Sequence, residues 1–394
     1  MLFRSDRNSD GEFGSEWGEV QEVEEENWYF KLSAHIDWLR NHVETHPDFV
    51  FPQFRRQELL NALEKSDKGD LCISRPKSRL RWGIELPFDT DFVTYVWFDA
   101  LTNYISFAGY QAAEDACLPV FEKLWTNTTH IIGKDILVPP HGIYWPIMLH
   151  AIGFSDDDMP RLLVHGWWNI RGEKMSKSLG NVVDPDQLAD TFGADGLRYY
   201  LMRDISTGGD ADFSPERIIM RFNSDLANDF GNLANRAINM IKRYRGGVLN
   251  SGDYDDELCQ EVRQVAEQTR KDYAEAMDGD LPHLALEHVW KLIVRANKFV
   301  EQTAPFTLAK EESESVKLDT VLYHLAEVLA EVSLLIAPVM PQAASNLQDQ
   351  LRLTPEQRTT LLGDIAWGIL PPGHETGKPK PLFPRLQLDE EAEE

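Results

Sequence analysis

The pattern of apolar and polar positions changes its period along the chain. Between residues 27 and 65, apolar side chains recur every three to four positions, which predicts helices. From 71 to 151, short β-rich runs alternate with helical stretches. Within that region, 92–98 and 129–132 are typical of buried strands and 142–152 of a helix.

A third strand and a long helical region follow. Residues 161–168 predict the strand, and because strands alternate with helices, the first part should be an α/β domain with a parallel sheet. Ser214-Pro215-Glu216 places a cap residue, a proline and an acid in the order that starts a helix. Helical periodicity then continues to about residue 350 and predicts an all-α domain. The end, 371–384, is proline-rich and irregular, and the sequence has no internal repeat.

Composition indicates a soluble, globular protein of two to three domains. The chain has 394 residues, 42% of them hydrophobic, with no signal pattern and no apolar run long enough to span a bilayer. Its three cysteines, Cys72, Cys117 and Cys259, lie far apart without a Cys-x-x-Cys pair. This usage predicts a cytoplasmic protein and argues against a structural zinc site.

The net charge of −26 restricts the kind of nucleic-acid contact that the chain could make. Diffuse neutralisation of a phosphate backbone is excluded, so any RNA contact should be local and should read shape or unstacked bases. Much of the acid lies in 6–26 and 389–394. Such runs are mostly solvated or disordered, and a dedicated acidic interaction tail is the alternative.

The most informative segment reads G-E-K-M-S-K-S-L-G-N, from Gly172 to Asn181. The ammonium groups of Lys174 and Lys177 can neutralise a leaving pyrophosphate, and the hydroxyls of Ser176 and Ser178 add donors. A solvated lysine pair on a surface turn is the ordinary interpretation of K-x-x-K. The full Lys-Met-Ser-Lys-Ser string arises by chance in roughly one chain of this length in ten thousand, so the segment predicts a catalytic loop.

Lys174 to Ser178 matches the KMSKS loop of class I aminoacyl-tRNA synthetases, and the surrounding residues resemble methionyl-tRNA synthetases in particular. The resemblance extends from about Asn27 to Arg385. It implies the C-terminal half of a Rossmann-type catalytic domain followed by an all-α anticodon-binding bundle. It also implies ATP-dependent activation of methionine and its transfer to tRNA(Met), with Mg²⁺ on the ATP phosphates and Lys174, Met175 and Lys177 as ATP contacts.

The resemblance also implies a division into five parts. They are an acidic remnant of an upstream insertion (1–26), the second half of the Rossmann-type domain (27–160), a KMSKS-loop and stem-contact segment (161–215), the anticodon-binding helices (216–355) and a proline-rich, acidic tail (356–394).

The other class I signature, His-x-Gly-His, does not occur in the sequence. His141-Gly142 and His165-Gly166 are the close pairs, and neither opens a helix as required. The expectation is therefore a chain that lacks the N-terminal part of the enzyme and is inactive alone, with the missing half as a partner if the gene is split. A misplaced start, an incomplete sequence and a protein that is truly short are the alternatives to a split gene. The family's zinc-binding insertion lies upstream, so no zinc site is expected in this chain.

Two aromatic segments, 95–104 and 132–146, follow predicted strands, at the end where open α/β sheets bind ligands. An aromatic strand taken alone is most often core. The resemblance implies a methionine pocket lined by Trp97, Ala100, Leu101, Tyr104, Leu137, His141 and Trp145. A thioether suits aromatic edges and aliphatic walls, with Tyr104 or His141 donating to sulfur. Leu101 stands where some family members have proline.

Gly133 and Asp135 are the expected contacts to the nucleotide. Glycine allows close approach of the backbone, and a carboxylate can accept both ribose hydroxyls, although Asp135 could equally be an ordinary cap residue. Arg75 matches a family arginine near the reacting groups, with an ordinary surface arginine as the alternative. His165 and Trp168 precede the lysine loop, where the resemblance implies contact with the adenine region, and core packing is the equal alternative.

A third signature lies in the helical part. Asn232 and Arg236 are four residues apart and so share a helix face, where an amide and a guanidinium can read unpaired bases. They match the family's anticodon-reading pair, and a plain polar face is the alternative. Phe306 stands where a tryptophan commonly stacks on an anticodon base.

Two other functions remain open at this point. A class I synthetase for isoleucine, valine, leucine or cysteine would share the lysine loop, although the aromatic set argues against it. A non-catalytic tRNA-binding remnant would use only the helical part.

Overall fold

The computed structural model describes residues 25–65, 69–113, 117–118, 120–170, 172–175, 181–250 and 252–386. The chain forms two compact units, Met1–Val164 and His165–Glu394, called here the first and second units. Within the described residues, no helix is long and apolar enough to cross a membrane.

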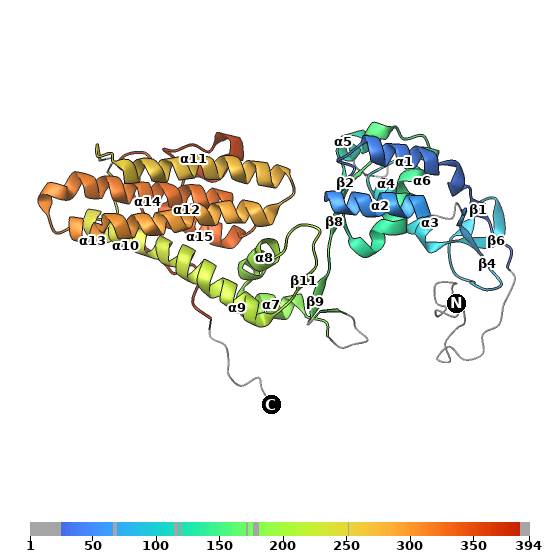
Figure 1. Ribbon diagram of the computed structural model, residues 1–394, viewed down its shortest axis with the longest axis horizontal. Coiled ribbons are helices and arrows are strands. Elements are labelled where there is room, and N and C mark those ends of the chain that lie inside the picture. Colours follow the sequence, from blue (N-terminus) through green and yellow to red (C-terminus); the bar gives the residue numbers. More distant parts are fainter. Residues whose placement is uncertain are drawn as a thin grey trace, which may run out of the picture. The chain divides into compact units, whose positions relative to one another are not determined.

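The first unit contains a three-stranded sheet. Its strands are β2 (Val50–Phe51), β8 (Arg161–His165) and β7 (Thr129–Gly133), in the order β2-β8-β7, and β2 and β8 are labelled in Figure 1. β2 and β8 pair in parallel, with Val50 opposite Leu162. Apolar residues of these strands are fully buried against α1 (Ile36–Thr45) and α2 (Gln53–Lys65), which explains their β-rich sequence. The α/β prediction for this part is confirmed.

Two further sheets, of two and three strands, lie in the described part of the first unit. β1 (Tyr29–Phe30) pairs with β3 (Leu71–Cys72), and β6 (Asp89–Thr94) lies between β4 (Ser74–Pro76) and β5 (Glu85–Leu86). All of these pairs are antiparallel.

The strand predicted at 92–98 is wrong in its second half. β6 ends at Thr94, and α3 (Val96–Ala100) and α4 (Asn103–Phe107) follow. Tyr95 keeps an extended backbone, and its carbonyl accepts from the amides of Phe98 and Asp99 at 3.0 and 3.1 Å. A short apolar run does not distinguish strand from helix, and here the turn starts one residue after the strand ends.

The helical prediction for 27–65 is also only partly right. α1 ends at Thr45 because Pro47 follows, and a residue before proline disfavours the helical conformation; His46 has φ −115° and ψ 83°. A short strand, β2, then separates α1 from α2. Further along, the strand predicted at 161–168 is two: β8 ends at His165 and β9 (Trp168–Ile170) begins a different sheet.

The second unit begins with that small sheet. β9 pairs with β10 (Glu173–Lys174) and, in parallel, with β11 (Ala211–Asp212). Three helices come next in the sequence. They are α7 (Pro185–Phe192) and α8 (Ala194–Arg203), between β10 and β11, and α9 (Pro215–Arg221), after β11. The predicted start of α9 is confirmed, because the Ser214 hydroxyl accepts from the amide of Arg217 at 3.3 Å.

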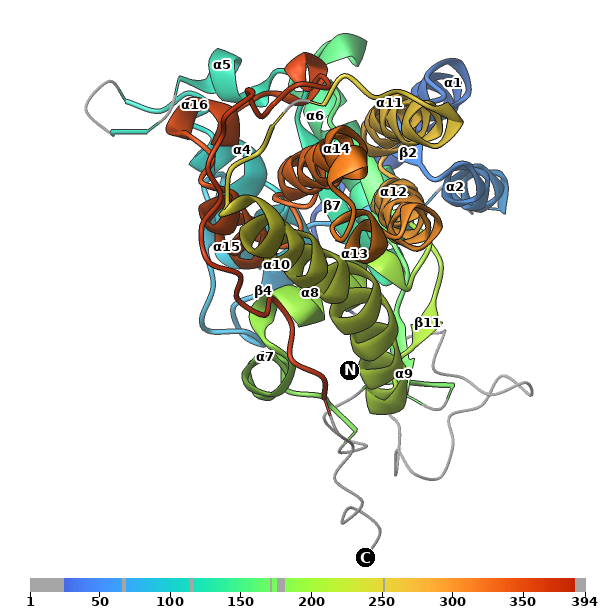
Figure 2. The ribbon, with the colours of Figure 1, turned by 90° about the vertical axis from the view of Figure 1, so that its left-hand side faces the viewer.

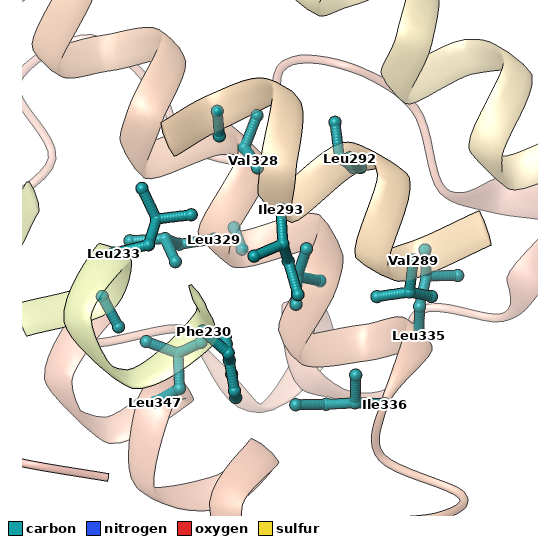
Figure 3. Packing of buried hydrophobic residues seen from close by; sticks show 14 of the residues in the cluster. Phe230, Leu233, Val289, Leu292, Ile293, Val328, Leu329, Leu335, Ile336 and Leu347 are labelled. Carbon is teal, nitrogen blue, oxygen red and sulfur yellow. The ribbon is translucent and has the colours of Figure 1, made fainter. Parts of the chain in front are cut away.

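A bundle of long helices forms the rest of the second unit, as the all-α prediction required. Its members are a π-helical segment (η7, Phe222–Gly231), α10 (Asn232–Arg245), α11 (Glu257–Asp278), α12 (Pro282–Thr303), α14 (Ser315–Leu335) and α15 (Pro341–Leu351). α11, α12 and α14 run side by side in Figure 1 and are seen nearly end-on in Figure 2. Figure 3 shows Ile293, Val328 and Leu329 meeting between the helices, each fully buried. Each such side chain contributes about 1.5–3 kcal/mol of transfer free energy.

The segment after α15 packs against the bundle. It contains α16 (Pro355–Arg358) and a 3₁₀ turn (η9, Leu362–Asp364). The buried carboxylate of Glu327, on α14, accepts hydrogen bonds from three consecutive amides, Gly368, Ile369 and Leu370, at 2.6–3.0 Å. The proline-rich end is thus irregular, as predicted, but is fixed to the helical core.

Candidate functional site

Two of the expected methionine-pocket residues are joined directly. The hydroxyl of Tyr104, on α4, lies 2.8 Å from Nε2 of His141, in the π-helical segment η5 (Leu137–Tyr144). Nδ1 of His141 lies 3.0 Å from the carbonyl oxygen of Ile136. Burial lowers the pKa of His141, so its ring is neutral at pH 7. Because a carbonyl can only accept, Nδ1 carries the proton and Nε2 accepts the hydroxyl hydrogen of Tyr104.

This pairing corrects one detail of the sequence prediction. The hydroxyl hydrogen of Tyr104 and the ring hydrogen of His141 are both used within the protein. In this arrangement neither side chain donates to a ligand sulfur. The site offers a thioether the faces and edges of aromatic rings instead.

A second histidine, which the sequence reasoning did not single out, completes the group. His130, on β7, accepts a hydrogen bond from Nε1 of Trp145 at 3.0 Å, and its ring lies 4.2 Å from that of Tyr104. Burial, with a smaller contribution from His141, lowers the pKa of His130 to about 4. Its place in the buried strand 129–132 was the available signal, because a polar residue in such a strand needs a partner.

The walls around these rings are aliphatic and aromatic. Leu101 and Trp145 belong to one buried cluster, with Trp97 and Tyr104 packed against it. Leu137 is also fully buried, but in the neighbouring cluster around the sheet of β2, β8 and β7. Ala100 is half-buried at the end of α3. The structure therefore brings five of the seven predicted residues together, four aromatic side chains and one leucine: Trp97, Leu101, Tyr104, His141 and Trp145.

A surface hollow of about 730 Å³ is also present in the first unit. It is open, and Tyr110, Phe121 and Phe154 are among its lining residues. None of the predicted methionine, nucleotide or anticodon residues that the structure describes lines it. Size alone does not make it the candidate site, because the converging polar groups described above lie outside it.

The predicted nucleotide residues lie at the end of β7, and the predicted catalytic arginine lies within β4. Gly133 ends β7, and Asp135 is exposed in the 3₁₀ turn that follows. Arg75, on β4, has its guanidinium 4.6 Å from the ring centre of Tyr95 and donates to the carbonyl of Ser74 at 2.7 Å. Arg75 is thus fixed beside Tyr95, the residue that separates β6 from α3.

Lys174, the first lysine of the loop, packs against Trp167, whose own backbone is held by hydrogen bonds. Lys174 ends β10, and its ammonium lies 3.9 Å from the ring centre of Trp167. The amide of Trp167 donates to Asp210 at 2.9 Å, and its carbonyl accepts from Ala211 at 3.0 Å. The half-buried Met175 packs against the small apolar core beside β9. Lys177, Ser176 and Ser178 lie outside the described residues.

His165 and Trp168 have different surroundings. His165 is exposed at the end of β8. Trp168 packs against Tyr200 and Phe213, with ring centres 5.5 and 6.2 Å away, so its observed contacts are those of core packing. Between them, a Cβ at Gly166 would lie 2.0 Å from the carbonyl oxygen of Gly209, so only glycine fits this approach.

The predicted anticodon residues lie on two helices of the second unit. Asn232 and Arg236 lie one turn apart on α10, exposed and half-buried respectively. Phe306, on α13 (Pro305–Leu308), is 51% exposed, as a stacking platform must be.

A surface hollow of about 400 Å³ adjoins Asn232. Its lining also includes Asn228, Asn235 and Arg385. Arg385 donates to Asn228 at 3.2 Å, so a residue of the C-terminal segment helps to shape the surface near the predicted anticodon pair. Sequence reasoning missed Asn235 and Arg385. Asn235 stands in the asparagine-rich run 223–239, whereas nothing local marks Arg385.

Comparison with known proteins decides the family. The model of class I tRNA synthetases of the methionine type matches residues 15–238, and that of the anticodon-binding domain of methionyl-tRNA ligase matches 247–394. Among solved structures, the Mycobacterium tuberculosis methionyl-tRNA synthetase in complex with methionyl-adenylate superposes with a TM-score of 0.84 at 37% identity, covering 92% of this chain and 69% of that one. The chain belongs to the methionyl-tRNA synthetase family.

Curated members of the family are similar over nearly the whole chain. The methionine–tRNA ligase of Fusobacterium nucleatum is 41% identical over 372 residues, 94% of this chain, and that of Lactococcus lactis is 40% identical over 391 residues, 99% of this chain. The chain spans 57% of the length of each. Membership of the methionyl-tRNA synthetase family sets aside the synthetases for isoleucine, valine, leucine and cysteine.

Proposed function

We propose that this chain supplies the methionine site, the lysine loop and the anticodon-binding helices of a methionine–tRNA ligase. The observation that carries the proposal is the aromatic group in which Tyr104 is hydrogen-bonded to His141, and Trp145 to His130, with the rings of Tyr104 and His130 in contact. An aromatic enclosure in which the Tyr104 hydroxyl and the His141 ring hydrogen are already used within the protein suits an uncharged thioether.

The proposed reaction has two steps. A carboxylate oxygen of methionine attacks the α-phosphorus of ATP, the bond from that phosphorus to the bridging oxygen breaks, and pyrophosphate leaves. The methionyl group then passes from the adenylate to a hydroxyl at the 3′ end of tRNA(Met), releasing AMP. Mg²⁺ would accompany the triphosphate as part of the substrate.

The lysines act on the leaving group. Lys174 and Lys177 place positive charge where negative charge grows as pyrophosphate departs, which stabilises the transition state more than bound ATP. The ammonium of Lys174 starts from a defined position over Trp167. Gly133 and Asp135 would contact the ribose, and Arg75, His165, Met175, Ser176 and Ser178 the remaining phosphate and adenine groups.

The tRNA would be selected at its anticodon. Asn232 and Arg236 offer an amide and a guanidinium on one face of α10, and Phe306 offers an exposed ring. With a net charge of −26, the chain cannot rely on general attraction to phosphate. Recognition through a few unpaired bases is the consistent mode.

Catalysis also needs donors that this sequence does not contain. The 394 residues have no His-x-Gly-His segment. We therefore propose that residues 1–394 do not form the adenylate alone, and that the complementary half of the nucleotide fold, on a longer chain or on a separate one, restores the reaction.

Aminoacylation of tRNA tests this function. The protein is prepared with the complementary half and supplied with ATP, tRNA and one labelled amino acid at a time. Methionine should be attached to tRNA(Met), and isoleucine, valine, leucine and cysteine should not. Attachment of another amino acid, or of none, would reject the proposal. Robust methionine-dependent pyrophosphate exchange by residues 1–394 alone would reject only the requirement for a second half.

A further inference from the structure

Three potential metal ligands meet in the first unit, in a group that the ligase function does not use. His42 and His46 lie one turn apart at the C-terminal end of α1, and Asp156 opens the 3₁₀ turn η6 (Asp156–Asp158) that precedes β8. One ligand atom from each of the three lies within 4.8 Å of the others.

His42 is the unusual member of the group. Its side chain is 1% exposed, and among the described residues neither ring nitrogen has a hydrogen-bond partner. Nδ1 lies 3.8 Å from Oδ2 of Asp156, beyond hydrogen-bonding distance. A buried polar group left without a partner costs about 1–3 kcal/mol of stability. A ligand bound to a ring nitrogen of His42 would remove this cost.

The other two side chains are oriented by hydrogen bonds on their far sides. Nε1 of Trp38 donates to Oδ1 of Asp156 at 2.9 Å, which leaves Oδ2 as the oxygen nearest to His42. Nδ1 of His46 lies 3.0 Å from the carbonyl oxygen of His42 and 3.0 Å from the hydroxyl of Thr45, which itself donates to the carbonyl of Asn41. Because a carbonyl can only accept, Nδ1 of the neutral His46 ring carries the proton and Nε2 keeps its lone pair. Metal ligands are commonly held by outer hydrogen bonds of both kinds.

We propose that His42, His46 and Asp156 form a binding site for a divalent first-row transition metal ion, with Zn²⁺ as the expected occupant. Two imidazoles and one carboxylate are a donor set that Zn²⁺ accepts, whereas Ca²⁺ and Mg²⁺ prefer oxygen donors. The side chain of Asp156 is 43% exposed, which gives the ion a path from solvent and leaves a position for water. The expectation of no zinc site rested on the cysteines and on the resemblance. It did not cover a site made of histidine and aspartate alone, as this one is.

Ligation requires one local change. The rings of His42 and His46 stack with centres 4.2 Å apart and planes at 25°, and an ion bound to both must lie near both ring planes. The His46 ring is half-buried and can turn, at the cost of the contact between its Nδ1 and the carbonyl oxygen of His42, whereas His42 lies between Trp38 and Phe49, with ring centres 5.4 and 4.7 Å away. The bound ion would fasten α1 to η6, two segments far apart in the sequence, and so stabilise the first unit.

Zinc titration of residues 1–394, after removal of metals with a chelator, tests the site. Isothermal titration should show one Zn²⁺ per chain, and Co²⁺ should give a visible absorption band that Zn²⁺ abolishes. His46→Ala and Asp156→Asn should each weaken Zn²⁺ binding at least tenfold. Asp157→Asn, which removes a neighbouring exposed carboxylate of η6, should leave it unchanged. Circular dichroism at 222 nm would confirm that each variant is folded.

Two results would overturn the proposal. One is a folded wild-type protein that binds no Zn²⁺ at micromolar concentrations. The other is equal Zn²⁺ affinity in the wild type, His46→Ala and Asp156→Asn, which would place the ion at another histidine-containing surface. The test is independent of the ligase proposal, because it involves neither ATP nor tRNA.

Discussion

At the scale of single residues, His130 links the methionine site to the pH dependence of stability. Its folded pKa of about 4 lies below the usual 6.5, because burial disfavours the charged ring. Between these values the unfolded chain binds more protons than the folded one. The stability contributed by the neutral ring is therefore complete above pH 6.5 and is lost as the pH falls towards 4.

His130→Gln checks this contribution. Glutamine can still accept from Trp145 but does not titrate, so the variant should lose less stability than the wild type between pH 7.5 and pH 5. The expected difference is about 2 kcal/mol. Urea unfolding at the two pH values measures it, and the other buried histidines act alike in both proteins. An identical loss in both proteins would mean that burial does not keep the His130 ring neutral in the folded protein below pH 6.5.

The contact between Lys174 and Trp167 leads to a second prediction at the residue scale, for the protein prepared with the complementary half. Lys174→Ala should lower the rate of adenylate formation about 10²-fold, with methionine binding nearly unchanged, because the charge acts mainly as pyrophosphate leaves. Trp167→Leu removes only the ring under the ammonium, a contact of about 0.5–1 kcal/mol, and should lower the rate a few-fold. Trp167→Phe should recover much of that loss. Single-turnover kinetics measures each rate, and unaffected rates in Lys174→Ala would make the loop structural only.

At the scale of elements, the C-terminal segment depends on one buried carboxylate. Glu327→Ala leaves the amides of Gly368, Ile369 and Leu370 without their acceptor, so the segment should detach locally and stability should fall by about 2–4 kcal/mol. Hydrogen exchange at these three amides should accelerate strongly. Glu301→Ala, at an exposed glutamate of α12, is the matched control and should change neither quantity. Slow exchange in Glu327→Ala would show that other contacts hold the segment.

The elements also show what a sequence can and cannot predict here. The long helices of the bundle were predictable because each repeats its apolar positions over many turns, as in α12 and α14. The change from strand to helix at Tyr95 was not, because two short apolar elements follow each other without a turn residue between them. At the site, motifs identified Tyr104 and His141. The position of Asp156 beside His42 depends on the fold, which brings distant segments together.

At the scale of the whole molecule, the second unit should fold without the first. Its bundle core is continuous with α8 through Tyr199, which donates to Asp225 at 2.8 Å, and it extends into the C-terminal segment through the buried Leu370. A fragment limited to the predicted bundle, 216–355, would expose these contacts. Residues 165–386 should instead give a cooperative unfolding transition, because the contacts of this unit are mostly local and helical.

That fragment provides the test of tRNA selection. It should bind a stem-loop with the methionine anticodon CAU more tightly than the same stem with a scrambled loop. Arg236→Ala should cost about 1–3 kcal/mol for the cognate loop and remove most of the preference. Arg243→Ala removes the same charge two turns further along α10 and should weaken both loops slightly and equally. Phe306→Trp should hold or improve affinity, because a larger ring offers more stacking surface.

The comparison of the two arginines separates base reading from charge. A fragment that carries more Asp and Glu than Lys and Arg gains little from general attraction to phosphate, so a loss confined to Arg236→Ala and to the cognate loop requires direct contact with a base. Titrations at one fixed salt concentration, followed by fluorescence anisotropy of labelled stem-loops, give the four affinities. If both loops bind equally, and Arg236→Ala and Arg243→Ala behave alike, α10 does not read the anticodon.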